Sequence, residues 1–398
     1  MSASVSGRIG RVKPSPTLAA TARAAALRAA GKDVVSLTAG EPDFDTPAHI
    51  AEAGIAAIRA GHTRYTDVGG TPELKDAIIA KFEQDNGLRY ARNQILVSTG
   101  AKQTIYNLCM AVLDPGDEVV IPAPYWVSYP DMVELADGRP VIVSASPEQG
   151  YRINAAQLEA AITPRTRMLI LNSPSNPTGA AYSRTDLVAL GEVLRRHPRV
   201  LVCTDDMYEK IWWADEPFFS LAQAVPALYD RTITVNGCSK AYAMTGWRIG
   251  YCGGPREIIT AMATVQGQST SNPCSISQQA AIAALRGDQD CVATMTAAYR
   301  ERHDFVIAGL NALPGITALP GAGTFYAFAN VSGAMRALGL ANDEAFTDFL
   351  LTQAGVAVVA GSGFGAPGHV RISFATRREQ LDKALRQIDR ALRGPLFP

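Results

Sequence analysis

Between residues 70 and 300 the sequence alternates short apolar runs with longer segments of helical periodicity. The runs are rich in Val, Ile and Leu and are closed by turn-forming residues, a pattern typical of β-strands. They occupy residues 94–100, 117–124, 140–145, 167–179, 199–208, 231–240 and 246–254. Segments 101–117 and 183–198 lie between runs and carry apolar residues at helical spacing. This alternation predicts an α/β fold, in which helices cover both faces of a mostly parallel sheet.

The pattern changes after about residue 305. Strand-like stretches at 315–331, 355–365 and 369–375 precede an amphipathic helical pattern, and together they predict a smaller α+β unit. We therefore expect an N-terminal arm with part of the small domain in 1–45, a large cofactor-binding domain in 46–305 and a small C-terminal domain in 306–398. Because no Gly/Ser-rich linker separates them, the two domains should share an interface.

Composition and charge exclude several classes of protein. Lys and Arg together number 37, as do Asp and Glu, so no net charge attracts nucleic acid. No run of about 18 apolar residues is present to span a membrane, and the N-terminus lacks the apolar core of a secretory signal. The five histidines form no metal-ligand pattern, and the six cysteines are predicted to be small buried side chains in a reducing compartment. We expect a cytoplasmic protein that needs no metal.

Two lysines stand apart from the other six. Lys102 and Lys240 each follow a predicted strand directly, at the carboxyl edge where open α/β sheets bind their ligands. A lysine in a partly desolvated cleft can attack an aldehyde and form a Schiff base, whereas the commoner role is to cap a strand or pair with a carboxylate. The remaining lysines lie in the N-terminal arm (residue 13) or in polar or helical surroundings, where a solvated side chain is expected (residues 32, 75, 81, 210 and 383).

A Schiff-base lysine most often holds pyridoxal phosphate, which also needs a phosphate cradle. The stretch "VSTGAKQT" at 97–104 is a strand, a glycine turn and a helix start. It offers the backbone N–H groups of Gly100, Ala101 and Lys102 to an anion. Ser239 and Arg248 can add a hydroxyl and a guanidinium to the same phosphate.

The same cofactor needs partners for its ring nitrogen and its phenolate oxygen. Asp205 ends a predicted strand and would keep the ring nitrogen protonated, and Tyr208 follows three residues later. Asn176 lies in the rigid "SPSNPTG" turn, from which its amide could reach the phenolate oxygen together with Tyr208. Singly, each residue also has a structural interpretation as a cap or turn former, but their joint order after successive strands favours the cofactor site.

These blocks resemble the class I aminotransferases of the aspartate aminotransferase superfamily, which are pyridoxal-phosphate enzymes of fold type I. The similarity rests on "LTAGEPDFDTP", "RYTDVGGTPELK", "PYWVSYP", "NSPSNPTG", "SKAYAMTGWRIGY" and "HVRISFA", which occur in the family's order over essentially the whole chain. The resemblance implies that Lys240 is the Schiff-base lysine and proton shuttle. It also implies that Asp205 pairs with the ring nitrogen, that Asn176 and Tyr208 contact the phenolate oxygen, and that Trp126 stacks on the ring.

The resemblance further implies the substrate contacts. Arg371 of "HVRIS" matches the arginine that grips the substrate α-carboxylate, with help from the Gly40 backbone N–H, Asn176 and Trp126. Tyr65 of "RYTD" matches a tyrosine that reaches the phosphate bound in the neighbouring subunit, so a homodimer is implied too.

One departure concerns specificity. Some aspartate enzymes carry an arginine shortly before a "SNP" turn, and this arginine binds the distal carboxylate of the substrate from the other subunit. The corresponding stretch here, "VQGQSTSNP", has no basic residue. "GAKQ" and "KPSPT" instead resemble a bacterial aspartate subgroup in which Lys102 and Ser15 would meet the distal carboxylate; otherwise Lys102 is a plain phosphate-loop lysine. We expect aspartate:2-oxoglutarate amino transfer by a ping-pong mechanism. Aromatic or prephenate amino transfer and a carbon–sulfur β-lyase remain open alternatives, whereas a cofactor-sensing regulator would need a DNA-binding domain, for which no residues are left.

Overall fold

Seven strands form the larger sheet of the protein, whose computed structural model describes residues 4–394. Neighbouring strands follow the order β2 (Ile95–Ser98), β8 (Gly250–Gly253), β7 (Thr232–Gly237), β6 (Leu201–Asp205), β5 (Thr166–Asn172), β3 (Glu118–Ala123) and β4 (Arg139–Ser144). Only β8 runs against its neighbours in this sheet. The mostly parallel sheet expected from the apolar runs is therefore confirmed.

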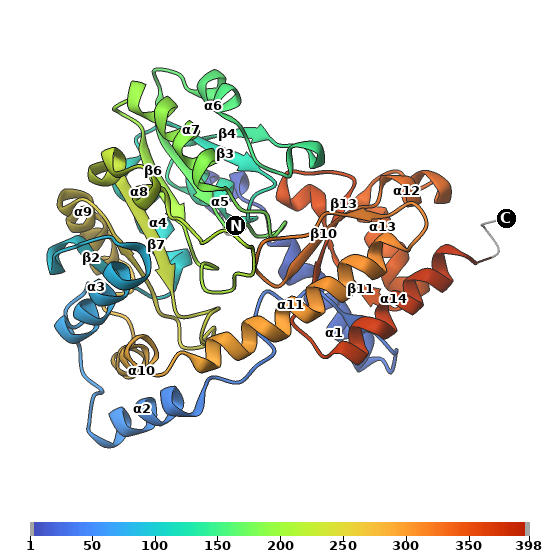
Figure 1. Cartoon of the computed structure of the whole chain (residues 1–398), viewed down its shortest axis with the longest axis horizontal. Coiled ribbons are helices and arrows are strands. Elements are labelled where there is room, and N and C mark those ends of the chain that lie inside the picture. The colour runs from blue at the N-terminus through green and yellow to red at the C-terminus, as the bar shows by residue number, and fades with distance from the viewer. Residues whose placement is uncertain (1–3, 395–398) are drawn as a thin grey trace.

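Helices cover both faces of this sheet, because alternate strand residues point in opposite directions. In β5, Met168 and Ile170 pack against the helices of one face, and Leu169 and Leu171 pack against those of the other. The first face is covered by α4 (Ala101–Val112), α5 (Ser128–Leu135) and α9 (Arg256–Gly267). The second is covered by α3 (Pro72–Asn86), α6 (Ala155–Ala161), α7 (Arg184–Arg196), α8 (Leu221–Ala224) and α10 (Ser275–Arg286), with α2 (Ala48–Arg59) against α10. Figure 1 shows this layered arrangement.

A smaller unit is built around an antiparallel sheet. Its strands follow the order β12 (Val359–Ala360), β13 (His369–Ser373), β10 (Tyr326–Asn330) and β9 (Thr317–Ala318). Beside it lie α12 (Ser332–Leu338), α13 (Asp343–Phe349) and α14 (Arg378–Leu392), which lies near the C-terminus (Figure 1). This is the smaller α+β unit that the sequence predicts.

Two elements connect the units. The long helix α11 (Asp290–Asn311) runs from beside α10 to the smaller unit, and it continues through residue 305 (Figure 1). Near the N-terminus, β1 (Val35–Ser36) pairs in parallel with β11 (Val356–Ala357), and α1 (Pro16–Ala29) lies beside them. The proposed division into segments 1–45, 46–305 and 306–398 stays a prediction, and residues 1–3 and 395–398 lie outside the described part.

Two expectations about single residues were wrong. Lys81 was expected to face solvent, but it is only 5% exposed, because its amine pairs with the Glu209 carboxylate and donates to Asn86 Oδ1 at 2.7 Å. The cysteines were expected to be buried, yet Cys274 is exposed at the start of α10 and Cys291 is half-buried. Neither site could be judged from local sequence, because burial depends on packing against distant segments.

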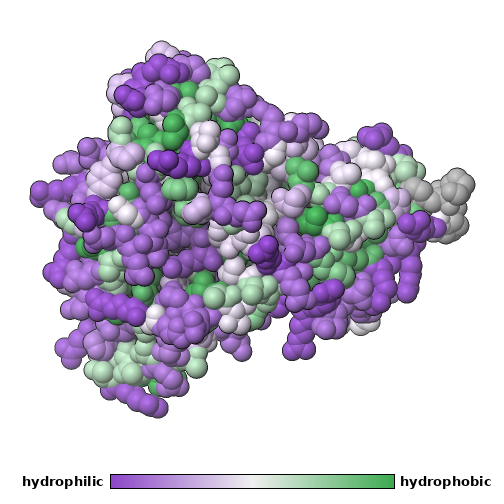
Figure 2. All heavy atoms as spheres, viewed as in Figure 1, coloured by the Kyte–Doolittle hydropathy of each residue, from purple (hydrophilic) through white to green (hydrophobic). Residues whose placement is uncertain are grey.

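The surface is mainly hydrophilic in the view of Figure 2, with hydrophobic residues gathered over α2 at the lower left. Ile55 and Ile58 of this helix are among the exposed large apolar side chains. Within residues 4–394, no helix combines the length and the apolar character needed to cross a lipid bilayer.

Candidate active site

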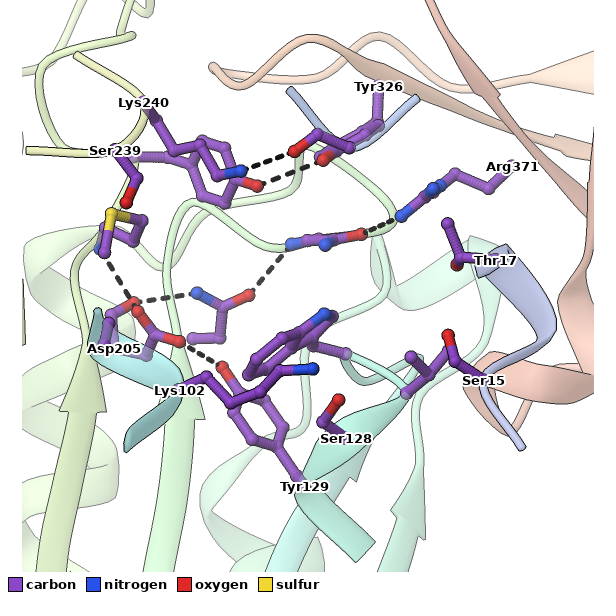
Figure 3. A pocket seen from close by; sticks show the side chains of 18 of the residues that line it. Ser15, Thr17, Lys102, Ser128, Tyr129, Asp205, Ser239, Lys240, Tyr326 and Arg371 are labelled. Atoms are coloured by element: carbon purple, nitrogen blue, oxygen red, sulfur yellow. Dashed lines mark hydrogen bonds between the residues drawn. The ribbon is translucent and has the colours of Figure 1, made fainter. Parts of the chain in front are cut away.

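A cavity of about 670 Å³ opens between the two units, at the carboxyl ends of β5, β6 and β7. Most side chains expected from the sequence converge on it (Figure 3). Its lining includes Ser15, Gly40, Ala101, Lys102, Trp126, Asn176, Asp205, Tyr208, Ser239, Lys240, Arg248 and Arg371. Gly100 adjoins this lining as the residue before α4, whereas Tyr65 is 92% exposed and lies outside the cavity.

Lys240 lies in the loop after β7, and its Nζ donates a hydrogen bond to the Gly40 carbonyl (Figure 3). Burial lowers the pKa of this amine to about 8, against the opposing attraction of Glu41. A lysine with such a pKa is partly neutral near physiological pH, and the neutral amine is the nucleophilic form.

The glycine turn before α4 makes a close approach to Arg248. Gly100 has φ +85°, and a side chain there would collide with the Arg248 guanidinium. That guanidinium donates to the carbonyls of Thr245 at 3.0 Å and Thr99 at 3.3 Å, which holds it beside the first turn of α4. Backbone N–H groups at a helix start and an adjacent guanidinium suit a phosphate group.

Asp205 ends β6 and is buried across the cavity from Lys240. Its Oδ2 accepts a hydrogen bond from the Tyr129 hydroxyl at 2.6 Å, and its Oδ1 accepts one from the Met207 N–H at 3.3 Å. Burial raises the pKa of Asp205, while these two donors lower it. A cationic ring nitrogen would favour the ionised carboxylate here, so the residue suits that partner. The adjacent Asp206 is also buried but does not line the cavity.

Arg371 of β13 is a buried cation, only 2% exposed. It donates to Asn176 Oδ1 at 3.0 Å and to the Thr38 carbonyl at 2.9 Å, while its Nε has no hydrogen-bond partner within the described residues. The guanidinium also lies over the Tyr326 ring, at 4.5 Å from the centroid. None of the ion pairs formed within residues 4–394 involves Arg371, and burying such a charge unpaired is costly. The site therefore suits a carboxylate from a ligand.

Lys102 and Ser15 also line the cavity (Figure 3). The Lys102 Nζ is 4.9 Å from the centre of the Trp126 ring, and partial desolvation and the nearby Arg248 lower the pKa of Lys102. Ser15 caps α1 by accepting from the Leu18 N–H at 3.4 Å, while Pro16 begins the helix. A ligand held by Arg371 would thus meet a second cation, Lys102, elsewhere in the same cavity.

Four contributors to the site were not recognised in the sequence: Tyr129, Tyr326, Asn172 and Thr38. Tyr129 lies in the first turn of α5, and its ring meets the Trp126 ring edge-on at 5.3 Å between centroids; both residues belong to the aromatic stretch "PYWVSYP", which was the available signal. The Tyr326 hydroxyl is 3.2 Å from the Tyr208 hydroxyl, which is otherwise expected to reach the cofactor. The Tyr326 contact joins positions 118 residues apart, and no local pattern indicates it.

These groups define a class of site: an amine nucleophile, an anion cradle, a buried carboxylate and an unpaired buried guanidinium at the edge of an α/β sheet. The family model for aminotransferase class I and II matches residues 32–388, and the chain belongs to this family. The chain is 54% identical to an aspartate/prephenate aminotransferase of Nitrosomonas europaea, over 96% of this chain and 98% of that one.

Solved structures agree with this assignment. The aspartate aminotransferase from Rhizobium meliloti superimposes with a TM-score of 0.94 at 50% identity, covering 98% of this chain and 99% of that one. The aspartate aminotransferase from Thermus thermophilus, solved with maleate, superimposes with a TM-score of 0.92 at 43% identity, covering 98% and 100%. The family and the fold expected from the sequence motifs are therefore confirmed, and the protein is an aminotransferase.

Proposed function

We propose that the protein is a pyridoxal-phosphate-dependent aminotransferase that exchanges amino groups between aspartate and 2-oxoglutarate. The observation that carries this proposal is the convergence of Lys240, Asp205 and Arg371 on one cavity. An amine, a buried carboxylate and a buried guanidinium match the aldehyde and ring nitrogen of the cofactor and the carboxylate of an amino acid.

The chain's own residues fit this cofactor. Gly100, Ala101 and Lys102 would offer backbone N–H groups to its phosphate, together with Ser239 and Arg248. Asp205 would pair with the ring nitrogen, Asn176 and Tyr208 would contact the phenolate oxygen, and Trp126 would lie against the ring. Gly100 has φ +85° and lies against the Arg248 guanidinium, so a side chain there would be strained and would push that guanidinium away from the turn.

When bound, pyridoxal phosphate supplies an aldehyde that reacts with amines and a ring that withdraws electrons from the substrate α-carbon. Lys240 would hold the cofactor until the substrate amine takes its place. Its freed amine, with a pKa near 8, is then suited to carry the proton from the α-carbon to cofactor C4′. Arg371, Asn176 and the Gly40 N–H would bind the substrate α-carboxylate and orient the α-carbon.

Aspartate is proposed because Lys102 supplies a second cation to the cavity, with the Ser15 hydroxyl also in its lining. A dicarboxylate held by Arg371 at one end would meet Lys102 at the other, as a charge-assisted contact. The R. meliloti and T. thermophilus relatives are named aspartate aminotransferases. Prephenate is a second candidate acceptor, because the N. europaea relative is named for both substrates.

We also propose a homodimer in which Tyr65 reaches the phosphate held by the partner subunit. Support comes from its almost complete exposure and from the apolar residues gathered over α2 (Figure 2). Sedimentation of the holoenzyme tests the dimer. Tyr65→Phe should weaken cofactor binding without changing the mass. The cytoplasmic location stays a prediction.

Reduction and product analysis test the chemistry. Borohydride should fix the cofactor on Lys240 alone, as peptide mapping would show, and label on Lys102 would overturn the assignment. Aspartate with 2-oxoglutarate should give glutamate and oxaloacetate. Pyruvate and ammonia released from cysteine-type donors, without glutamate, would instead identify a β-lyase.

Specificity is tested by Lys102→Ser, with Lys32→Ser on the exposed surface as the matched control. Loss of the charge-assisted contact should lower kcat/KM for aspartate relative to phenylalanine by roughly ten- to a hundredfold. The ratio is measured at saturating cofactor, because Lys102 also belongs to the phosphate turn. An unchanged ratio would remove the support for aspartate and leave the general aminotransferase.

A further inference from the structure

Asn172, the last residue of β5, uses both halves of its side-chain amide. Its Nδ2 donates to the main-chain carbonyl of Asp205 at 2.8 Å, and its Oδ1 accepts from the Asn176 N–H at 2.9 Å. This amide therefore lies between the main chain of Asp205 and that of Asn176. The residue also lines the cavity.

The connection continues beyond Asn176. The Asn176 side-chain oxygen accepts from Arg371 Nη1 at 3.0 Å, and Arg371 Nη2 donates to the Thr38 carbonyl at 2.9 Å. A continuous series of hydrogen bonds and short main-chain links therefore joins β6 of the large sheet to β13 of the small sheet. Asn172 is its central member, because its side chain bridges the residue expected at the ring nitrogen and the turn that carries Asn176.

The chemistry of the amide suits this position closely. One side chain must donate to a carbonyl on one side and accept from an N–H on the other, and both partners are main-chain groups with fixed places. Aspartate lacks the donor, leucine lacks both groups, and glutamine is one methylene longer. The position therefore demands the length and polarity of asparagine.

We propose that Asn172 is a positioning residue that sets the separation between Asp205 and the carboxylate-binding pair Asn176 and Arg371. The proposal rests on the proposed function, because that separation matters only if the ring and the substrate carboxylate occupy one site. A substrate held at its carboxylate must present its α-carbon to the ring, and a displacement of about 1 Å can cost about a hundredfold in rate. Asn172 acts through Asp205 and Asn176, not on the reacting atoms.

The test uses holoenzyme with Asn172→Ala and measures two quantities. The first is the Kd of maleate, an unreactive dicarboxylate, by calorimetry. The second is kcat/KM for aspartate and for phenylalanine. We expect the Kd to rise and both kcat/KM values to fall by a similar factor, roughly ten- to a hundredfold, because the α-carboxylate contact is common to both donors. Their ratio should stay unchanged, in contrast to Lys102→Ser.

A control variant and a double-mutant cycle distinguish the positioning role of Asn172 from a purely structural role. Asn330 ends β10 and accepts from the Ser332 N–H at 3.0 Å, so Asn330→Ala removes a similar turn bond far from Asp205 and should leave maleate binding unchanged. In an Asn176→Ala background, Asn172→Ala should change the maleate Kd by less than about twofold, because the connection is already broken. Asn172→Asp replaces the Nδ2 donor by an oxygen that faces the Asp205 carbonyl, so it should raise the maleate Kd at least as much as Asn172→Ala.

The outcomes distinguish the positioning role of Asn172 from the proposed aminotransferase function. Independent effects that multiply in the double variant, or a maleate Kd within twofold of wild type in Asn172→Ala, would refute the positioning role while leaving the aminotransferase intact. Should Asn172→Ala fail to fold, Asn172→Asp in the two Asn176 backgrounds gives the same comparison. A wild-type protein that neither binds maleate nor transfers amino groups would refute both proposals.

Discussion

Tyr129→Phe removes one hydroxyl from the buried carboxylate of the site. Tyr129 is 1% exposed, and its hydroxyl donates to Asp205 Oδ2 at 2.6 Å. Among the residues that the structure describes, the Met207 N–H, at 3.3 Å from Oδ1, is then the one remaining donor to that carboxylate. The variant therefore tests how strongly the protein stabilises the ionised form of Asp205, with the ring volume left unchanged.

The expected loss of kcat in Tyr129→Phe follows from the type of hydrogen bond that is removed. A hydrogen bond to a charged group contributes about 1.5–3 kcal/mol, and a pKa shift of one unit corresponds to about 1.4 kcal/mol. Loss of the hydroxyl should thus raise the pKa of Asp205 further, because the ionised carboxylate loses a donor worth about 1.5–3 kcal/mol. A more basic carboxylate takes the proton from the ring nitrogen, so the ring withdraws electrons less well. We expect kcat to fall by about ten- to a hundredfold.

Steady-state rates with aspartate and 2-oxoglutarate measure this effect, and a pH titration of the cofactor's visible absorbance reports the ring environment directly. Tyr299→Phe is the matched control, because this hydroxyl is buried without a hydrogen-bond partner among the described residues. Its removal should leave the rate and the spectrum unchanged. A Tyr129→Phe rate within twofold of wild type would show that the hydroxyl does not govern the Asp205 carboxylate.

Asp205→Asn should retain cofactor binding, measured by equilibrium titration, while kcat falls by several orders of magnitude; a loss of less than about tenfold would place the ring partner elsewhere. In the cofactor-free protein, Lys240→Met should raise the melting temperature at pH 7, because it removes a buried charge. The folded pKa of Lys240, about 8, lies below the unfolded value, so wild-type stability rises between pH 8 and pH 10. The gain in melting temperature from Lys240→Met should therefore shrink over the same range. A gain independent of pH would contradict the reasoning. Lys81→Met leaves the buried Glu209 carboxylate unpaired and should cost about 3–5 kcal/mol in urea unfolding, whereas a loss below about 1 kcal/mol would mean that water reaches Glu209.

The strands and several cavity-lining residues could be predicted because the strands are short apolar runs and these residues directly follow them in the sequence. Apolar runs indicated the strands, and parallel strands bring their carboxyl ends to one edge, so Asp205, Asn176 and Lys240 were expected to meet. The resemblance supplied Arg371 and Gly40, which no periodicity could connect to that edge.

Apart from Tyr129, the missed features are contacts between distant segments. The burial of Lys81 depends on Glu209, which lies beyond five strands in the sequence, and helical position alone favoured a solvated side chain. The bridging role of Asn172 depends on Asp205, 33 residues away, being beside it in the sheet. Such pairings follow from strand order, which single-sequence patterns do not specify.

The pairing of β1 with β11 has a consequence for synthesis on the ribosome. The two strands are about 320 residues apart in the chain, so at 5–20 residues per second β1 emerges roughly 15 to 65 s before its partner. All seven strands of the large sheet precede residue 254, and they can associate while the small unit still lacks most of its chain. Arg371 belongs to that late unit. A nascent chain therefore completes the half of the site that is proposed to face the cofactor well before it has Arg371, the residue proposed to bind a substrate carboxylate.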